Sequence, residues 1–412
     1  MSLEILINTV HKQTSLSSEE DVIKTLYRFI NLLPSKFSEE KFIHILETED
    51  NCQEFKKIIG IMIDLDFIQT KFHIDCLDQD ESYTSNNLDE NCKLCLHNIN
   101  DLNHEVKKVY SLKRGLATEI TQKHDKTLLN HYLIETFKRN LTSLEENKAY
   151  LIPFYGAGLS VPLGYPSWGG MLWDLSTHLE DDMQPPYKRY IKNGEYLKAL
   201  EYLQEHSIIT TEADIKEEIL KNFSQAEIKD TFSTPNNYLD LFDLKSEFYI
   251  TTNYDNALTS LATKLGPFTL PYTLEDLKDV PSFLRENRQR VLHLHGNIEK
   301  SETMIVTKND YELLYSGGEI LQKLLAIMGT KSFLFLGFSF QDEFFKELYL
   351  KITSQIKGNH FLIMPNISLK DAQILSRNNL KVIGINVETD ATGRYVTEDY
   401  VQGIKTILKQ LL

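Results

Sequence analysis

The feature that most constrains the fold is an apolar run that stops abruptly at two glycines flanking an alanine. Residues 150–155 are Tyr-Leu-Ile-Pro-Phe-Tyr, and Gly156, Ala157 and Gly158 follow directly. This pattern predicts a buried strand that turns sharply into a helix, because glycine tolerates backbone angles that other residues avoid. The N–H groups at the start of such a helix favour an anionic ligand. A tight turn without any ligand would give the same pattern.

Apolar runs and helical stretches alternate from residue 150 to the end of the chain. The runs are apolar at consecutive positions, which is typical of strands covered on both faces in a parallel sheet. They occupy residues 150–155, 248–252, 291–294, 333–336, 360–364 and 382–385. We therefore predict an α/β domain with a Rossmann-like, doubly wound parallel sheet over residues 145–412, interrupted by a helical insertion at about residues 170–245.

The first part of the chain has a different pattern. Helical periodicity begins near residues 18, 38 and 55, and residues 67–73 alternate like a strand. Three helices and a strand are compatible with a winged helix, so we predict a small winged-helix-like α/β module over residues 1–72. Acidic residues outnumber basic ones two to one in residues 1–100, which favours contact with protein over contact with nucleic acid.

All four cysteines lie in the first quarter of the chain, which argues against a disulfide scaffold. A histidine–cysteine pair and a cysteine–cysteine pair, each with two intervening residues, are separated by 15 residues. This spacing is typical of structural zinc sites. The predicted ligands are His73, Cys76, Cys92 and Cys95. Chance proximity and a degenerate ribbon without metal remain open alternatives. Residues 73–144 are interpreted as a zinc-ribbon-like segment followed by a helical connector.

The bulk composition excludes several classes of protein. A chain of 412 residues suggests two or three domains. A formal net charge of −15 gives no support to a general nucleic-acid coat, although a local basic patch stays open. No apolar segment is long enough to span a bilayer, and the N-terminus lacks a signal-peptide pattern. We expect a cytoplasmic protein that contacts neither membrane nor, directly, nucleic acid.

Small or polar residues follow the predicted strands at the positions where open α/β sheets bind their ligands. These residues are Thr251-Thr252-Asn253-Tyr254-Asp255, His295-Gly296, Gly337-Phe338-Ser339 and Asn386. Each has a structural alternative, since Asn253 and Asp255 could cap a helix and His295 could be a turn histidine. Their joint occurrence in order, after the Gly-Ala-Gly turn, indicates one shared site.

This ordered set of motifs resembles the Sir2 (sirtuin) family, specifically its prokaryotic SIR2-like branch found in antiphage defence proteins. The resemblance covers about residues 145–412. Its NAD-binding signature matches Gly156-Ala157-Gly158-x-Ser160, its Thr-Gln-Asn-x-Asp element matches residues 251–255, and its catalytic His-Gly matches His295-Gly296. Two further elements, Gly-x-Ser and Ile-Asn, match Gly337-Phe338-Ser339 and Ile385-Asn386.

The resemblance implies that NAD is the substrate and assigns roles to the matching residues. The expected NAD-binding residues are Gly156, Ala157, Gly158, Ser160, Trp168, Thr252, Gly337, Ser339 and Asn386. Trp168 is expected to stack near nicotinamide. Asn253 would hold the attacking water, His295 would act as general base, and Asp255 would orient its neighbours.

The sequence differs from the sirtuin deacylases at positions that distinguish protein deacylation from NAD hydrolysis. No cysteine follows Cys95, so the zinc ribbon that follows the catalytic histidine in deacylases is absent. Ser167-Trp168-Gly169 stands where deacylases have Asp-Phe-Arg. The resemblance therefore implies NAD hydrolysis to nicotinamide and ADP-ribose. A protein deacylase and an NAD- or ADP-ribose-binding module without turnover are the alternatives. Family members work as oligomers or with a trigger such as a HerA-type ATPase, so a homo-oligomer or a protein partner is expected.

Overall fold

A computed structural model describes most of the chain as two compact units, residues 1–129 and 130–412. The division falls inside helix α5 (Leu116–Tyr132) and not at residues 72 and 144, where domain boundaries were expected. The described residues are 2–33, 36–48, 52–266, 271–276, 289–316, 322, 331–338, 349–350, 359–377 and 379–412.

The first unit begins with four helices, which are α1 (Leu3–Gln13), α2 (Glu19–Leu32), α3 (Glu39–Thr48) and α4 (Cys52–Asp64). The last three lie where the sequence predicts them, and α1 was not predicted. Ser18 starts α2 because its hydroxyl accepts a hydrogen bond from the N–H of Asp21. The apolar faces of α1, α2 and α4 pack into one core together with Phe67 and Tyr110.

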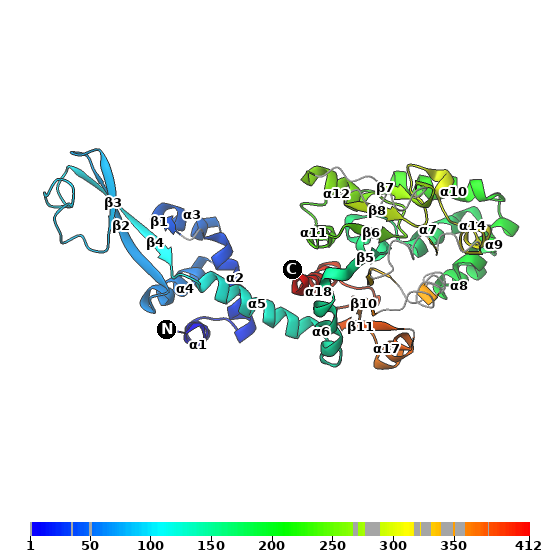
Figure 1. Ribbon diagram of the computed structural model, residues 1–412, viewed down its shortest axis with the longest axis horizontal. Helices are drawn as coiled ribbons and strands as arrows, with labels where there is room; N and C mark the ends of the chain where they lie inside the picture. The colour runs from blue at the N-terminus through cyan, green and yellow to red at the C-terminus, as the bar shows by residue number, and fades with distance from the viewer. Residues whose placement is uncertain are drawn as a thin grey trace. The chain divides into compact units, whose positions relative to one another are not determined.

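An antiparallel sheet completes the first unit, in the order β1-β4-β2-β3. Its strands are β1 (Lys36–Ser38), β2 (Ile68–Cys76), β3 (Glu81–Ser85) and β4 (His104–Leu112). Figure 1 shows β2 and β3 extending away from the helices. The strand predicted at residues 67–73 is β2, which continues to Cys76, so the expected boundary after residue 72 lies within a strand. Whether this unit is a winged helix stays a prediction.

The second unit is built on a seven-stranded sheet in the order β11-β10-β9-β5-β6-β8-β7, and every pairing is parallel. Its strands are β5 (Leu151–Tyr155), β6 (Phe248–Thr251), β7 (Pro271–Thr273), β8 (Arg290–His293), β9 (Ser332–Leu336), β10 (His360–Pro365) and β11 (Leu380–Ile385). This confirms the predicted Rossmann-like sheet. Strand order reverses between β5 and β9, where such sheets bind ligands.

Helices flank this sheet and form the predicted insertion between β5 and β6. The insertion holds α7 (Trp168–Asp174), α8 (Gln184–Lys192), α9 (Tyr196–His206), α10 (Glu212–Gln225) and α11 (Tyr238–Asp243). The others described are α6 (Lys138–Glu146), α12 (Ala257–Leu265), α14 (Lys308–Ser316), α17 (Leu369–Ser376) and α18 (Thr397–Leu408). Figure 1 shows α9, α10 and α14 grouped together, and the Thr307 hydroxyl donates to Glu212 at 3.0 Å.

No helix in the described part of the chain combines the length and the apolar character that crossing a bilayer requires.

Candidate active site

The chain turns sharply after β5, as predicted, but the helical turns that follow directly are 3₁₀ and not α-helical. Two short 3₁₀ turns follow, Ala157–Leu159 and Val161–Leu163, and the first α-helix begins at Trp168. Pro162 has no N–H to donate to a continuing helix, and Gly164 takes the left-handed backbone conformation with a φ of 91°. The turn is therefore a compact loop at the carboxyl edge of the sheet.

The glycines of this turn are required by a close backbone contact with the end of β9. The N–H of Gly156 donates to the carbonyl of Leu336 at 2.8 Å, and that of Gly158 donates to the carbonyl of Gly337 at 3.0 Å. A Cβ on Gly337, whose φ is 70°, would lie 2.9 Å from the carbonyl oxygen of Gly156. These two N–H groups serve the fold. Contact of the turn with a pyrophosphate stays a prediction.

Ser160 is the centre of a buried hydrogen-bond network. Its hydroxyl donates to Asp255 Oδ2 at 2.7 Å and accepts from the Asn253 side-chain amide at 2.9 Å. The hydroxyl of Tyr238 shares a third hydrogen bond with it at 2.6 Å. One donor and two acceptors exhaust the capacity of a serine hydroxyl. Ser160 therefore positions Asn253. Tyr238 was missed because its place in the helical insertion gave no signal.

Asp255 connects this network to the start of α12. Its side chain is only 4% exposed and accepts from the N–H of Ala257 at 3.0 Å. Burial raises the pKa of Asp255, although its hydrogen bonds with Ser160 and Ala257 act in the opposite direction. Asp255 thus has the structural role that the sequence left open, in addition to fixing Ser160.

His293 supports the loop that carries Asn253. It ends β8, and its Nδ1 lies 2.9 Å from the carbonyl oxygen of Asn253, to which it donates. Burial lowers the pKa of His293 to about 4, although the hydrogen bond to Asn253 opposes the shift. The imidazole is therefore neutral at physiological pH, and its hydrogen bond to the Asn253 carbonyl fixes the loop after β6.

His295, two residues further along, is nearly enclosed, with 6% of its surface exposed. Burial lowers the pKa of His295 to about 3, so its ring is neutral and able to accept a proton. The Tyr311 hydroxyl lies 3.4 Å from its Nδ1. Gly296 follows with a φ of 82°, and a Cβ there would meet the Thr303 carbonyl oxygen at 2.1 Å. Only glycine fits at this turn.

The loops that carry Asn253 and His295 are hydrogen-bonded to each other. The carbonyl of Tyr254 accepts from the N–H of Ile298 at 3.1 Å, and the hydroxyl of Tyr254 donates to the carbonyl of Ile305 at 2.6 Å. The N–H of Ile305 in turn donates to the carbonyl of His295 at 2.9 Å. The two segments therefore lie together at the carboxyl edge of the sheet.

The remaining predicted NAD-binding residues lie on several different segments of the second unit. Trp168 is half-buried, with its ring edge-on to Tyr254 and the ring centroids 6.0 Å apart. Thr252 is half-buried at the end of β6. Asn386 is exposed, and its amide donates to the carbonyl of His131 at 3.4 Å. Ser339 lies outside the described residues. The roles of these side chains in binding a nucleotide stay predictions.

The predicted zinc ligands are brought together except for His73. His73 lies within β2, where residues three apart point to opposite faces, so it cannot face the same point as Cys76. Its Nε2 is 3.1 Å from Asp75 instead. His104, which the sequence analysis missed, lies with the three cysteines. The prediction of His73 was wrong because two-residue spacing converges in a turn but not in a strand.

Part of the second unit matches a known family of domains. Residues 247–383 match the model of the SIR2-like domain. Over this range the chain is similar to SIR2-like domains. This confirms the resemblance drawn from the sequence motifs, and the match contains Asn253, Asp255 and His295. The Gly156 turn and Ser160 precede the matched range, and the structure connects them to it through hydrogen bonds.

Curated proteins similar to this chain carry the name NAD(+) hydrolase ThsA. The relative from Cytobacillus dafuensis is 25% identical over 259 residues, covering 61% of this chain and 46% of that protein. The relative from Enterococcus faecium is 27% identical over 235 residues, covering 56% and 46%. The relative from Bacillus cereus (strain MSX-D12) is 28% identical over 216 residues, covering 51% and 41%. The chain thus spans less than half the length of these relatives.

Proposed function

We propose that the SIR2-like domain hydrolyses NAD+ to nicotinamide and ADP-ribose. The observation that carries this proposal is that buried Asn253 and buried, neutral His295 lie on hydrogen-bonded loops at adjacent strand ends. The names of the similar proteins support the same reaction. The carboxyl edge of the sheet, beside the reversal of strand order at β5, is where such a fold binds a dinucleotide.

In the proposed reaction, the bond between the nicotinamide nitrogen and ribose C1′ breaks, and nicotinamide leaves as a neutral molecule. A water oxygen forms the new bond to C1′, and its proton passes to His295. The side-chain amide of Asn253 orients this water, while Ser160 holds the amide in place. Positioning of this kind lowers the activation barrier, because the entropy cost of bringing the water and the ribose together is met when they bind.

The low basicity of His295 is compatible with this role. Positive charge develops on the ribose as nicotinamide leaves, so the attacking water becomes acidic as its oxygen approaches C1′. A weak base can then accept the proton, provided that it is neutral beforehand. Burial keeps His295 neutral and keeps bulk water out of the site.

We further propose that this activity acts in antiphage defence by depleting NAD in the cytoplasm. An enzyme that drains NAD must be held inactive until it is needed, so gating by homo-oligomerisation or by a protein partner such as a HerA-type ATPase is expected. Residues 1–129 and the helical insertion are the candidate surfaces for this control. Neither a membrane nor direct contact with nucleic acid is required.

The test is nicotinamide release from NAD+ by the purified full chain, followed by chromatography over a range of protein concentrations. Turnover should be lost in Asn253→Ala and in His295→Ala. His360→Gln is the matched control, because His360 is equally buried but starts β10 at the opposite edge of the parallel sheet. Tight NAD binding without turnover, even with a partner present, would instead indicate a binding module. Activity on acyl-lysine peptides would indicate a deacylase.

A further inference from the structure

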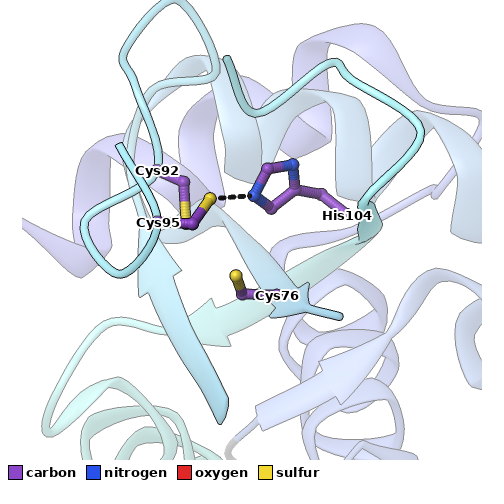
Figure 2. Close-up of side chains that lie close together, drawn as sticks. All are labelled: Cys76, Cys92, Cys95 and His104. Atoms are coloured by element: carbon purple, nitrogen blue, oxygen red, sulfur yellow. Dashed lines mark hydrogen bonds between the residues drawn. The ribbon is translucent and has the colours of Figure 1, made fainter. Parts of the chain in front are cut away.

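Three cysteines and one histidine converge at the end of the sheet in the first unit. Their ligand atoms all lie within 4.8 Å of one another, and Figure 2 shows the side chains turned toward a common point. Three of the residues are buried and Cys95 is half-buried. None of the three cysteines forms a disulfide. The members of this cluster are Cys76, Cys92, Cys95 and His104.

Strand register places two of the four side chains on one face. Cys76 is the last residue of β2 and His104 is the first residue of β4, and the two are direct antiparallel partners. Directly opposed residues project to the same face of a sheet. The Nε2 of His104 lies 3.2 Å from the sulfur of Cys95, and its Nδ1 has no hydrogen-bond partner among the described residues. The ring is thus directed through Nε2 at the cysteines.

A tight turn supplies the other two sulfurs. The sulfur of Cys92 accepts from the N–H of Leu94 at 3.5 Å, and the carbonyl of Cys92 accepts from the N–H of Leu96 at 2.9 Å. Leu96 has a φ of 65°, a left-handed conformation that is unfavourable for a residue with a side chain. Surrounding structure has to hold such a turn in place.

The apolar core around the turn is small. It has four buried members, of which two are cysteines of the cluster: Ile74, Cys76, Cys92 and Ile99. Five partly buried side chains pack against them, namely Phe72, Tyr83, Leu88, Leu94 and Cys95. The segment between β3 and β4, residues 86–103, contains no helix and no strand beyond a single antiparallel bridge between Asn91 and Asn98. Long segments of this kind in small units are commonly held by a metal or a disulfide.

We propose that Cys76, Cys92, Cys95 and His104 bind one structural zinc ion. Three thiolates and one imidazole are a ligand set that zinc prefers, and four protein ligands complete a tetrahedral shell without an open position for substrate. The ion joins the ends of β2 and β4 to the Cys92 turn. It is separate from the SIR2-like domain, so the proposal does not depend on NAD hydrolysis.

The experiment measures the metal content of the purified full chain by elemental analysis. We expect one zinc per chain, and replacement by Co²⁺ should give the absorption bands of a tetrahedral thiolate site. His104→Ala should lose most of the metal, whereas His104→Cys should retain it because a fourth thiolate replaces the imidazole. His73→Ala is the matched control and should retain full zinc, because His73 faces Asp75.

A second group that shares Cys95 provides the competing ligand set. Asp78, Cys95 and His97 also lie close together, but Asp78 and His97 are exposed. His97→Ala should therefore keep the metal. Two results would overturn the proposal: a wild-type chain without zinc or cobalt bands, or zinc that persists in folded His104→Ala and is lost in His97→Ala or His73→Ala. Circular dichroism of each variant separates loss of ligand from loss of fold.

Discussion

The side-chain amide of Asn253 donates a 2.9 Å hydrogen bond to the hydroxyl of Ser160, which lies 93 residues earlier in the chain. This bond joins the loop after β6 to the turn after β5, beside the reversal of strand order. Asp255 accepts from the same hydroxyl. The orientation of the proposed water-holding residue therefore depends on a serine that sequence motifs assigned to the nucleotide.

Ser160→Ala should lower NAD turnover more than it lowers NAD affinity. The change leaves Asn253 and Asp255 buried without their shared partner, which should also cost about 1–3 kcal/mol of stability. Steady-state kinetics and urea unfolding measure the two effects. Tyr238→Phe is the control, since it removes one bond to Ser160 and leaves the Asn253 bond intact. Equal losses of turnover in both variants would show that Ser160 does not act through Asn253.

His295→Gln should reduce turnover by about 10²- to 10⁴-fold, the usual contribution of a general base. The amide is similar in size to imidazole but accepts no proton at neutral pH. NAD binding, measured by calorimetry, should change little. Retained turnover in this variant would rule His295 out as the proton acceptor.

The pH profile of kcat/KM should show no acid limb near pH 6.5. An exposed histidine base would lose activity there as it becomes protonated. Because burial lowers the pKa of His295 to about 3, the proton-accepting form persists at lower pH. Initial rates from pH 8 down to pH 5 test this, and a half-maximal point near pH 6.5 would contradict the buried state of the ring in the free enzyme.

His293 should make the SIR2-like domain less stable as pH falls below 6.5. The pKa of His293 is about 4 in the folded state, so the unfolded chain binds more protons between these values and unfolding becomes easier on acidification. From pH 7 to pH 5 the effect of His293 is about 2 kcal/mol. Urea unfolding at the two pH values should show a smaller difference in His293→Gln than in wild type. An unchanged difference would argue against the depressed pKa.

Gly337→Ala should destabilise the domain by more than Gly393→Ala. Both glycines have left-handed backbones, which costs a substituted residue about 1–2 kcal/mol. At Gly337 the new Cβ also meets the backbone of Gly156 and Leu159 at 2.9 Å, whereas at Gly393 it meets nothing within 4 Å. Thermal unfolding of the pair isolates the close contact. Equal shifts in midpoint would mean that the loops after β5 and β9 can separate freely.

The strands and the order of the candidate site residues were accessible from the sequence. Runs such as Phe333–Leu336 are apolar at consecutive positions because both faces of a parallel strand are covered by helices. Residues that follow such runs must gather at one edge of the sheet, so the sequence alone groups Asn253 with His295. This reasoning needs only the period of the side chains and the direction of the strands.

Tertiary structure alone decided the partners. His104, and not His73, lies beside Cys76, because the pairing register between β2 and β4 places the two residues opposite each other. The local spacing of residues in the sequence does not reveal this register. Ser160 and Tyr238 meet in the same way, across 78 residues. Side-chain periodicity is local and can be seen in a single segment, whereas the choice of a hydrogen-bond or metal-site partner depends on packing between segments that are distant in the chain.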